Sequence, residues 1–435
     1  MKGFSLAKSS GTAPLLNSAE RQKVLNKVSA IVTKRLCKTQ MVSLDWPSAV
    51  ARHRDQIVNS ASDEEFERFM LALLAEIGKS HVGFFHEGLS RSSSKMVLAA
   101  TYMVSETAAG QYWTFQDVHA GGPAALAGIR PGDVLLSVDG RTFVPPEHPT
   151  FAVESNVTLK VLTKDLKEQD KTVKIPAAKR MRGQLPQVIP TPLVTSKRLR
   201  SDVGYIRVAM YPGSIGVDVA NEISFAVRNL GDVTRLILDL RGNTGGGIGV
   251  LRAMSLLTPS TLPIGRYSDG KLGPMNGAAG YHFVFNKVPA RTSHLLPLAL
   301  RFYATAALRK AIGHQMPIMI ATEGLGTMPF HGRVVLLVNR HTASANEMLI
   351  AFARDHGLAT VVGEATPGRV QGGGKFSLPN GYWLALPVGS YENKEGESLE
   401  GKPIQPDVYD AFDPEQARAG RDNQLDRALE VVAAL

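Results

Sequence analysis

The pattern of hydrophobic and polar residues over the first ninety positions predicts helices. It is clearest in SDEEFERFMLALLAEIG, where large apolar residues recur at helical spacing, at Phe66, Phe69, Met70, Leu73, Leu74 and Ile77. Ser62 and Glu65 form a capping-box pattern at the start of this helix, and Gly78 is suited to end it. Ser80 and His81 follow directly, so we expect them on a turn from which side chains can reach a neighbouring domain.

A strand-like pattern begins near residue 91. In VHAGGPAALAGIRPGDVLLSVDGR, residues 118–141, Gly132 and Gly140 suit tight turns. Alternating apolar positions predict a half-buried strand, at Val134, Leu136 and Val138. The segment resembles a PDZ domain, which implies a short helix over 123–127 and a carboxylate-binding loop near 107–112. PDZ domains add a peptide as a strand to a sheet edge, so this domain would present a peptide C-terminus.

From about residue 179 the pattern alternates between strands and helices. Continuous apolar runs predict buried strands in VGYIRVAMY, TRLILDLRG and RVVLLVN. Helical patterns occur over 247–257, in ANEMLIAFARDHG and over about 414–434. Residues 262–330 are rich in proline and glycine, with one helical segment near 298–311, and we expect an insertion or lid. Such alternation predicts an α/β domain.

Length and composition limit the kinds of protein this chain can be. A length of 435 residues suggests about three domains. Hydrophobic residues make up 44% and charged residues 20%, and no apolar run is long enough to cross a bilayer. The N-terminal MKGFSLAKSSGTAPLL lacks the apolar stretch of a secretory signal, so we expect a cytoplasmic location. The single cysteine, Cys37, cannot form an internal disulfide, and we expect it in a helical core.

Charge and histidine spacing argue against two classes of partner. The formal net charge is +10, but no nucleic-acid-binding motif accompanies the basic segments, and we expect no nucleic-acid partner. The histidines do not show metal-ligand spacing with carboxylates or cysteine, so the sequence predicts no metal and no cofactor.

Three segments carry the candidate chemistry: DLRGNTGGG at 239–247, TASANEM at 342–348 and VVGEATPGRVQGGG at 361–374. Their order resembles the tail-specific and tricorn-type serine peptidases, and the closing EGKPIQPDV matches the same family. The resemblance covers nearly the whole chain. It implies a multidomain α/β protein in four parts: a helical domain (1–90), a PDZ domain (91–178), a crotonase-like catalytic domain (179–412) and a C-terminal helix (413–435).

Ser344, the middle residue of TASAN, stands at the nucleophile position of that family. It follows a buried strand at the start of a helix, where free N–H groups and the helix dipole can stabilise an oxyanion. The Ala345 N–H would be one donor, and the glycine loop at Gly245 and Gly246 would supply the other. The alternative is that Ser344 is only a helix N-cap, because Ser344 and Glu347 also fit the capping-box pattern.

The base that would activate Ser344 is not the lysine of tail-specific proteases. The matching residue is Arg369, whose guanidinium stays protonated at physiological pH and cannot accept the proton. Arg369 is instead a candidate for binding a substrate carboxylate or carbonyl, or for a structural salt bridge. Lys375 lies six residues further on and is a weaker candidate for the base.

The tricorn-type branch of the family supplies a different base. The resemblance implies His81 as the base, Ser80 beside it, and Glu400 in SLEGKPIQPD as the residue that helps to stabilise the imidazolium. The sequence therefore predicts a serine endopeptidase that acts through an acyl-enzyme on unstructured proteins or peptides, with their C-termini recognised by the PDZ domain. The alternative is a catalytically impaired relative that serves as a peptide-binding adaptor, motivated by the missing lysine.

Overall fold

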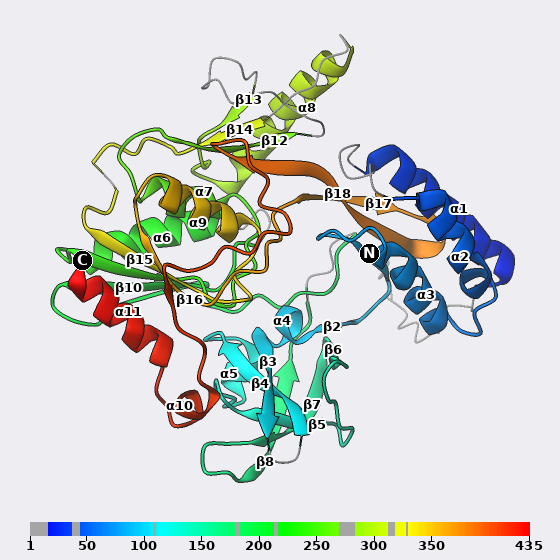
Figure 1. Cartoon of the computed structure of the whole chain (residues 1–435), viewed down its shortest axis with the longest axis horizontal. Coiled ribbons are helices and arrows are strands. Elements are labelled where there is room, and N and C mark those ends of the chain that lie inside the picture. The colour runs from blue at the N-terminus through cyan, green and yellow to red at the C-terminus, as the bar shows by residue number, and fades with distance from the viewer. Residues whose placement is uncertain are drawn as a thin grey trace, which may run out of the picture.

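The computed structural model describes residues 16–36, 44–107, 110–178, 183–212, 216–268, 283–311, 318–327 and 329–435. Cys37 lies outside these residues. Figure 1 shows a helical unit, a small sheet of antiparallel strands and a larger α/β unit arranged around a central region. The molecule is therefore a multidomain protein of mixed α/β class, as the sequence predicts.

The helical unit consists of α1 (Ser18–Arg35), α2 (Trp46–Val58) and α3 (Asp63–Ala75). The predicted cap of α3 is confirmed, because the Ser62 hydroxyl accepts a hydrogen bond from the Glu65 N–H at 3.1 Å. The Glu65 carboxylate accepts from the Ala61 N–H, one residue before the expected donor. Apolar residues from all three helices form one buried cluster.

This helical unit is completed by strands from the far end of the chain. β1 (Gly83–His86) and β17 (Gly372–Ser377) both pair antiparallel with β18 (Tyr382–Asn393). Leu384 and Leu386 of β18 are buried in the same apolar cluster as the helices. The first ninety residues therefore share their core with a hairpin nearly three hundred residues away in the chain.

β18 is a long strand that belongs to two units. Its first half pairs with β1 and β17, and its second half pairs with β12 (Pro263–Ser268). In Figure 1 it runs from the helical unit into the α/β unit. The strand therefore connects the units that carry His81 and Ser344.

The PDZ region is an antiparallel sheet in the order β3-β4-β5-β7-β8. Its strands are β3 (Ala100–Thr107), β4 (Gly110–Val118), β5 (Val134–Val138), β7 (Ser155–Leu162) and β8 (Glu168–Ile175). The strand expected over 134–138 is confirmed, and the short helix is α5 (Pro123–Leu126). Leu135 rather than Leu136 is fully buried, because a register shift between Leu135 and Ser137 breaks the simple alternation.

Residues 107–112, where a carboxylate-binding loop is expected, contribute the end of the hairpin between β3 and β4. Positions 108 and 109 of that loop lie outside the described residues. The remaining PDZ elements are α4 (Ser94–Val97) and a two-stranded pairing of β2 (Arg91–Ser93) with β6 (Thr150–Ala152).

The α/β unit is built on a six-stranded sheet in the order β19-β16-β15-β11-β10-β9. The strands are β9 (Val194–Arg198), β10 (Val203–Val208), β11 (Arg235–Asp239), β15 (Arg333–Val338), β16 (Thr360–Gly363) and β19 (Val408–Tyr409). All neighbouring pairs are parallel except β9 with β10. The three predicted apolar runs form β10, β11 and β15 at the centre, where both faces are buried.

Helices cover both faces of this sheet. One face packs in a single apolar cluster with α6 (Gly216–Leu230), α7 (Gly249–Ser255) and α9 (Ala345–Asp355). The other face packs against α11 (Asn423–Ala434), with Ala428 and Val432 buried. Alternate residues of each strand serve the two faces, as the period-two geometry of strands requires.

The prediction of a single C-terminal helix over 414–434 is wrong. The chain forms α10 (Pro414–Arg418) and α11, separated by four residues. Gly420 adopts a φ of +86° between them, a conformation that favours glycine. Asp422 then caps α11 by accepting a hydrogen bond from the Leu425 N–H at 3.0 Å.

The 262–330 segment adds an edge to the sheet that contains β18. β12 pairs with β14 (Ile318–Ala321), which pairs with β13 (Phe283–Phe285). The expected helix is α8 (Leu295–Ala311), preceded by a short 3₁₀ helix over Thr292–His294. A role for this segment as a lid stays a prediction. No helix of the described residues is long and apolar enough to span a membrane.

Candidate active site

Ser344 lies at a sharp turn between β15 and α9. Its backbone has φ +59° and ψ −120°, which a side-chain-bearing residue rarely adopts. Ordinary N-cap residues have extended backbone angles instead. Such strain costs about 1–3 kcal/mol and persists where the surroundings enforce it, which is typical of functional turns. The side chain is partly exposed while the residues on both sides are buried. This geometry favours the nucleophile over a simple capping serine.

The glycine loop lies directly against the Ser344 turn. A Cβ atom on Gly245 would overlap the Ala343 carbonyl and the Ala345 N–H, so only glycine fits there. The Gly245 N–H, however, donates to Asn243 Oδ1 at 2.9 Å. Gly245 thus brings the loop close to the turn, but its own N–H is already in use.

Gly246 and Ala345 are better placed than Gly245 to offer N–H donors. Tyr211 bonds to the Gly245 carbonyl and the Gly247 N–H, so the Gly246 N–H points away from Tyr211. Ala345 is the first residue of α9, where backbone N–H groups have no intrahelical acceptor. Within the described part of the chain, neither N–H donates a hydrogen bond. The two predicted donors are therefore available for a ligand oxygen.

Glu347 holds the Ser344 turn against the loop that follows β16. Its side chain is fully buried, and one carboxylate oxygen accepts the Ser344 N–H at 2.9 Å and the Arg369 N–H at 2.7 Å. The other oxygen accepts the Thr366 hydroxyl at 2.7 Å and the Gly368 N–H at 2.6 Å. Burial raises the pKa of Glu347, and these four hydrogen bonds act in the opposite direction.

Ser80, His81 and Glu400 form one hydrogen-bonded cluster across 320 positions of sequence. The Ser80 hydroxyl lies 2.8 Å from His81 Nδ1 and donates to Glu400 at 3.0 Å. The Ser80 N–H also donates to Glu400 at 2.8 Å. Because Nδ1 faces Ser80, the other ring nitrogen, Nε2, is left to accept a proton. The resemblance predicts this grouping, and the fold brings the three residues together.

The pKa of His81 lies below its ordinary value. Desolvation of the ring lowers the pKa, the negative charge of Glu400 raises it, and the positive charge of Arg369 lowers it again. The lowered pKa favours the neutral imidazole, which is the form that a general base needs. The ring also lies beside Gly373 of β17, where a Cβ atom would be in ordinary van der Waals contact with it.

One loop connects the Ser344 turn to the His81 cluster. Arg369 donates its N–H to Glu347, and the next residue, Val370, donates its N–H to Glu400 at 3.0 Å. Adjacent peptide groups are thus fixed to both halves of the candidate site. Within the described residues, no hydrogen bond joins Ser344 to His81 itself. Catalytic hydrogen bonds are often long without substrate and tighten when it binds.

Arg369 and Lys375 have different surroundings. The Arg369 side chain is exposed at this loop, where it acts on the His81 pKa and is free to meet a substrate. No salt bridge to Arg369 is present in the described structure. Lys375 lies on β17, two residues after the glycine beside His81, and its pKa is lowered by desolvation. Lys375 takes part in no hydrogen bond with the described catalytic residues.

Asp117 and Asn339 are two buried residues that the sequence reasoning missed. Asn339 Nδ2 donates to both oxygens of Asp117 on PDZ strand β4, at 3.1 and 3.0 Å. Its Oδ1 accepts the Gly242 N–H at 3.2 Å and the His341 N–H at 3.0 Å. One amide thus connects the PDZ sheet to the glycine loop and the Ser344 turn. The only sequence signal is a buried acid on a strand, which needs a partner.

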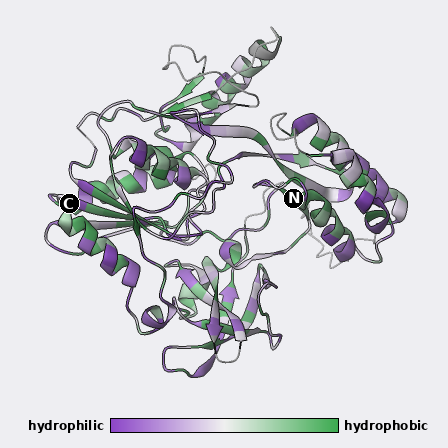
Figure 2. Cartoon of the chain, in the orientation of Figure 1, coloured by the Kyte–Doolittle hydropathy of each residue, from purple (hydrophilic) through white to green (hydrophobic). Residues whose placement is uncertain are grey.

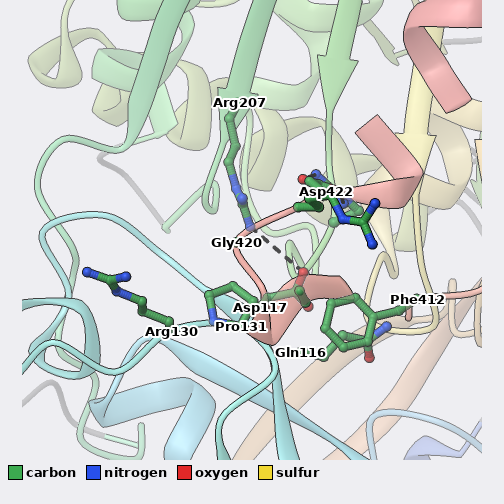
Figure 3. A pocket seen from close by; sticks show the side chains of 11 residues that line it. Gln116, Asp117, Arg130, Pro131, Arg207, Phe412, Gly420 and Asp422 are labelled. Atoms are coloured by element: carbon green, nitrogen blue, oxygen red, sulfur yellow. Dashed lines mark hydrogen bonds and ion pairs between the residues drawn. The ribbon is translucent and has the colours of Figure 1, made fainter. Parts of the chain in front are cut away.

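A pocket of about 210 Å³ lies where the PDZ sheet, the catalytic sheet and the C-terminal segment meet. Figure 3 shows Arg207 reaching from its strand toward Asp117, with an ion-pair distance of 3.8 Å. Arg241 pairs with Asp239 at 2.7 Å and with Asp422 at 2.8 Å, fixing the start of α11 to the end of β11. Charged contacts thus join three parts of the chain beside the glycine loop. No group of metal-ligating side chains occurs among the described residues.

Comparison with known proteins agrees with this geometry. Residues 202–410 match the model of peptidase family S41, and residues 114–161 match the model of the PDZ domain. The chain is 24% identical over 299 residues to a carboxyl-terminal-processing protease of Synechocystis sp., covering 66% of this chain and 56% of that protein. It is 21% identical over 435 residues to tricorn protease homolog 1 of Streptomyces coelicolor, covering 96% of this chain and 35% of that protein.

The chain thus spans only about a third to just over half of the length of these curated relatives. Among solved structures, mature CPAF complexed with lactacystin matches with a TM-score of 0.58 at 14% identity, over 95% of this chain and 97% of that one. At such identity the match establishes a shared fold.

Proposed function

We propose that the chain is a serine endopeptidase, on the premise that residues 202–410 match peptidase family S41 and residues 114–161 match the PDZ domain. One observation carries the proposal: the Ser80, His81 and Glu400 cluster is fixed to the same loop that Glu347 fixes to the Ser344 turn. One loop thus holds both the turn of the nucleophile candidate and the orienting groups of the base candidate, which supports the proposal.

In the proposed reaction, Ser344 Oγ attacks the substrate carbonyl while His81 Nε2 accepts its proton. The oxyanion is stabilised by the N–H groups of Ala345 and Gly246, and Gly245 serves to bring the loop close. His81 then gives the proton to the leaving amine, and water hydrolyses the acyl-enzyme by the reverse transfers. Ser80, held by Glu400, keeps the imidazole oriented and favours its charged form.

We assign the base to His81, as in the tricorn-type branch, rather than to a lysine. The support is chemical: His81 is neutral near pH 7 and has a hydrogen-bonded partner on Nδ1. Arg369 cannot act as a base, and its exposed guanidinium is proposed to hold a substrate carbonyl or carboxylate. The crotonase-like character of the catalytic fold, the domain boundaries and the cytoplasmic location stay predictions.

We also propose that the PDZ domain recognises substrate C-termini. A pocket of about 170 Å³ lies between β3, α4 and the loop before β6, lined by Lys95, Tyr102 and His341 among others. Burial lowers the pKa of Lys95 to about 8, so its ammonium is still mostly charged at pH 7 and would gain from a carboxylate partner. Lys95→Gln should weaken cleavage of substrates with a free C-terminus and leave C-terminally amidated ones unchanged.

The catalytic proposal is tested with an unstructured protein substrate and a serine-reactive phosphonate probe. Wild type should cleave and become labelled, Ser344→Ala should do neither, and His81→Ala should lose most of both. Ser293→Ala, an exposed serine of the 262–330 segment, is the matched control and should behave as wild type. If wild type neither cleaves nor is labelled, the adaptor alternative holds. Full activity in His81→Ala would reject the assigned base alone.

A further inference from the structure

Helix α8 exposes an unusually apolar outer face. Its largest exposed side chains lie on one side of the helix and are each about two-thirds accessible, at Leu296 (66%), Leu300 (62%), Tyr303 (68%) and Leu308 (66%). Three of them follow the i, i+4, i+7 spacing of a single helical stripe. Ala304, Ala307 and Ala311 are exposed on the same side. A stripe of this length on a soluble surface marks an interaction site.

The opposite face of α8 is attached to the protein. Phe302 packs edge-on against Phe283 of β13 at 5.2 Å between ring centroids, and the Arg301 guanidinium lies 5.9 Å from the same ring. Figures 1 and 2 show α8 at one end of the molecule, beyond β13 and β14 and away from the PDZ and helical units. The apolar stripe is therefore held on a supported element that faces outward.

The sequence around this helix is rich in basic residues. Between Asp269 and Glu323 it has no acidic residue and has six basic ones, at Lys271, Lys287, Arg291, Arg301, Arg309 and Lys310. Of the described side chains, Lys287, Arg291 and Arg301 are exposed. An apolar stripe in a basic segment with exposed cations is the pattern of a helix that lies in the interface of an anionic membrane.

We infer that the outer face of α8 docks the protein on an anionic lipid surface. The helix would lie along the headgroup boundary, with its leucines and Tyr303 entering the acyl region and the cations facing lipid phosphates. The inference is independent of the catalytic proposal. It concerns where the protein acts, and it would place the peptidase site beside membrane-associated substrates.

A second copy of the chain fits this face less well. A helix of 17 residues is about 25 Å long, so its stripe covers roughly 250 Å². A stable protein interface needs about 800 Å² from each partner. Pairing two such helices would also set two basic segments against each other, whereas a lipid leaflet supplies both apolar depth and negative charge.

The test is co-sedimentation with vesicles of phosphatidylcholine alone or with about a third phosphatidylglycerol. Wild type should bind only the anionic vesicles, and raising the salt to about 0.5 M should weaken binding. The variant Leu296→Ser/Leu300→Ser/Tyr303→Ser should lose at least about tenfold in partitioning. The charge variant Lys287→Glu/Arg291→Glu should lose a similar factor.

The matched control removes three exposed apolar side chains elsewhere, in Leu126→Ser/Leu166→Ser/Phe225→Ser. This control should bind vesicles as wild type does. The inference is overturned if wild type ignores anionic vesicles, or if the α8 variant binds them undiminished. It is also overturned if sedimentation analysis shows a wild-type dimer that the α8 variant abolishes without any vesicle binding, since a second copy would then be the occupant.

Discussion

Replacing Glu347 with glutamine should loosen the Ser344 turn, because this buried side chain is the acceptor for four hydrogen bonds. Each carboxylate oxygen accepts two of them, one pair from Ser344 and Arg369 and the other from Thr366 and Gly368. Glutamine keeps one oxygen and replaces the other with an NH₂ group. If the NH₂ group takes the side of Ser344 and Arg369, it faces two N–H donors and two hydrogen bonds are lost. On the side of Thr366 and Gly368 it can donate to the Thr366 hydroxyl, so only the bond from the Gly368 N–H is lost.

The size of the effect follows from the loss of one or two bonds. Hydrogen bonds to a charged group contribute about 1.5–3 kcal/mol each, which gives a gross loss of about 1.5–6 kcal/mol. Part is returned because Glu347→Gln no longer buries a charge, as the raised pKa of Glu347 indicates. We expect a net loss of about 3 kcal/mol. For a domain of this size that lowers Tm by about 6–12 °C.

Differential scanning calorimetry of the two proteins measures the shift, and labelling by the phosphonate probe reports on the turn. Labelling should slow in Glu347→Gln, because the Ser344 N–H loses its charged acceptor and the strained backbone is held less firmly. Glu430→Gln is the matched control: it removes an exposed glutamate paired with Arg427 and should change stability by less than about 0.5 kcal/mol. A Glu347→Gln protein that melts within 2 °C of wild type and is labelled at the same rate refutes the reasoning.

Three further predictions concern the same site. Arg369→Gln removes a positive charge that lowers the His81 pKa, so the acid limb of kcat/KM should move to higher pH; Glu400→Gln removes a negative charge and should move it to lower pH. If the acid limb moves in the same direction in both variants, the assignment of His81 as the base is wrong. Gly246→Ala should lower kcat by about 10²-fold or more, because its Cβ would displace an oxyanion donor; unchanged kcat would remove Gly246 from that role. Asp117→Ala leaves a buried amide short of an acceptor and should reduce kcat/KM about tenfold, and normal kinetics would show that the PDZ contact does not position the turn.

The local patterns of the sequence predicted most of the elements but not how distant ones pair. Helical spacing located α3, and continuous apolar runs located β10, β11 and β15. Nothing local indicates that β18 completes the helical unit, because an apolar strand carries no mark of its partner. The break between α10 and α11 was missed for a different reason. The amphipathic pattern continues across Gly420, but Gly420 has a left-handed backbone, which does not continue a helix.

Part of the candidate site could likewise be predicted from the sequence, and part could not. The family resemblance grouped Ser80, His81 and Glu400, and the fold brings them within hydrogen-bonding distance. Which glycine N–H is free could not be predicted, because it depends on the side-chain oxygen of Asn243. The contact between Asp117 and Asn339 joins two domains, so neither residue's neighbours in sequence reveal it.

The geometry of β18 implies how the two halves of the site are brought together. The strand pairs with β1 over residues 382–385 and with β12 over 390–393, so one continuous backbone spans both units. Glu400 adds a further connection, from Ser80 to the loop beside Ser344. These connections resist separation of His81 from the Ser344 turn. The PDZ domain is bonded through Asp117 to the Ser344 side of the site, so we expect it to act on the nucleophile turn rather than on His81.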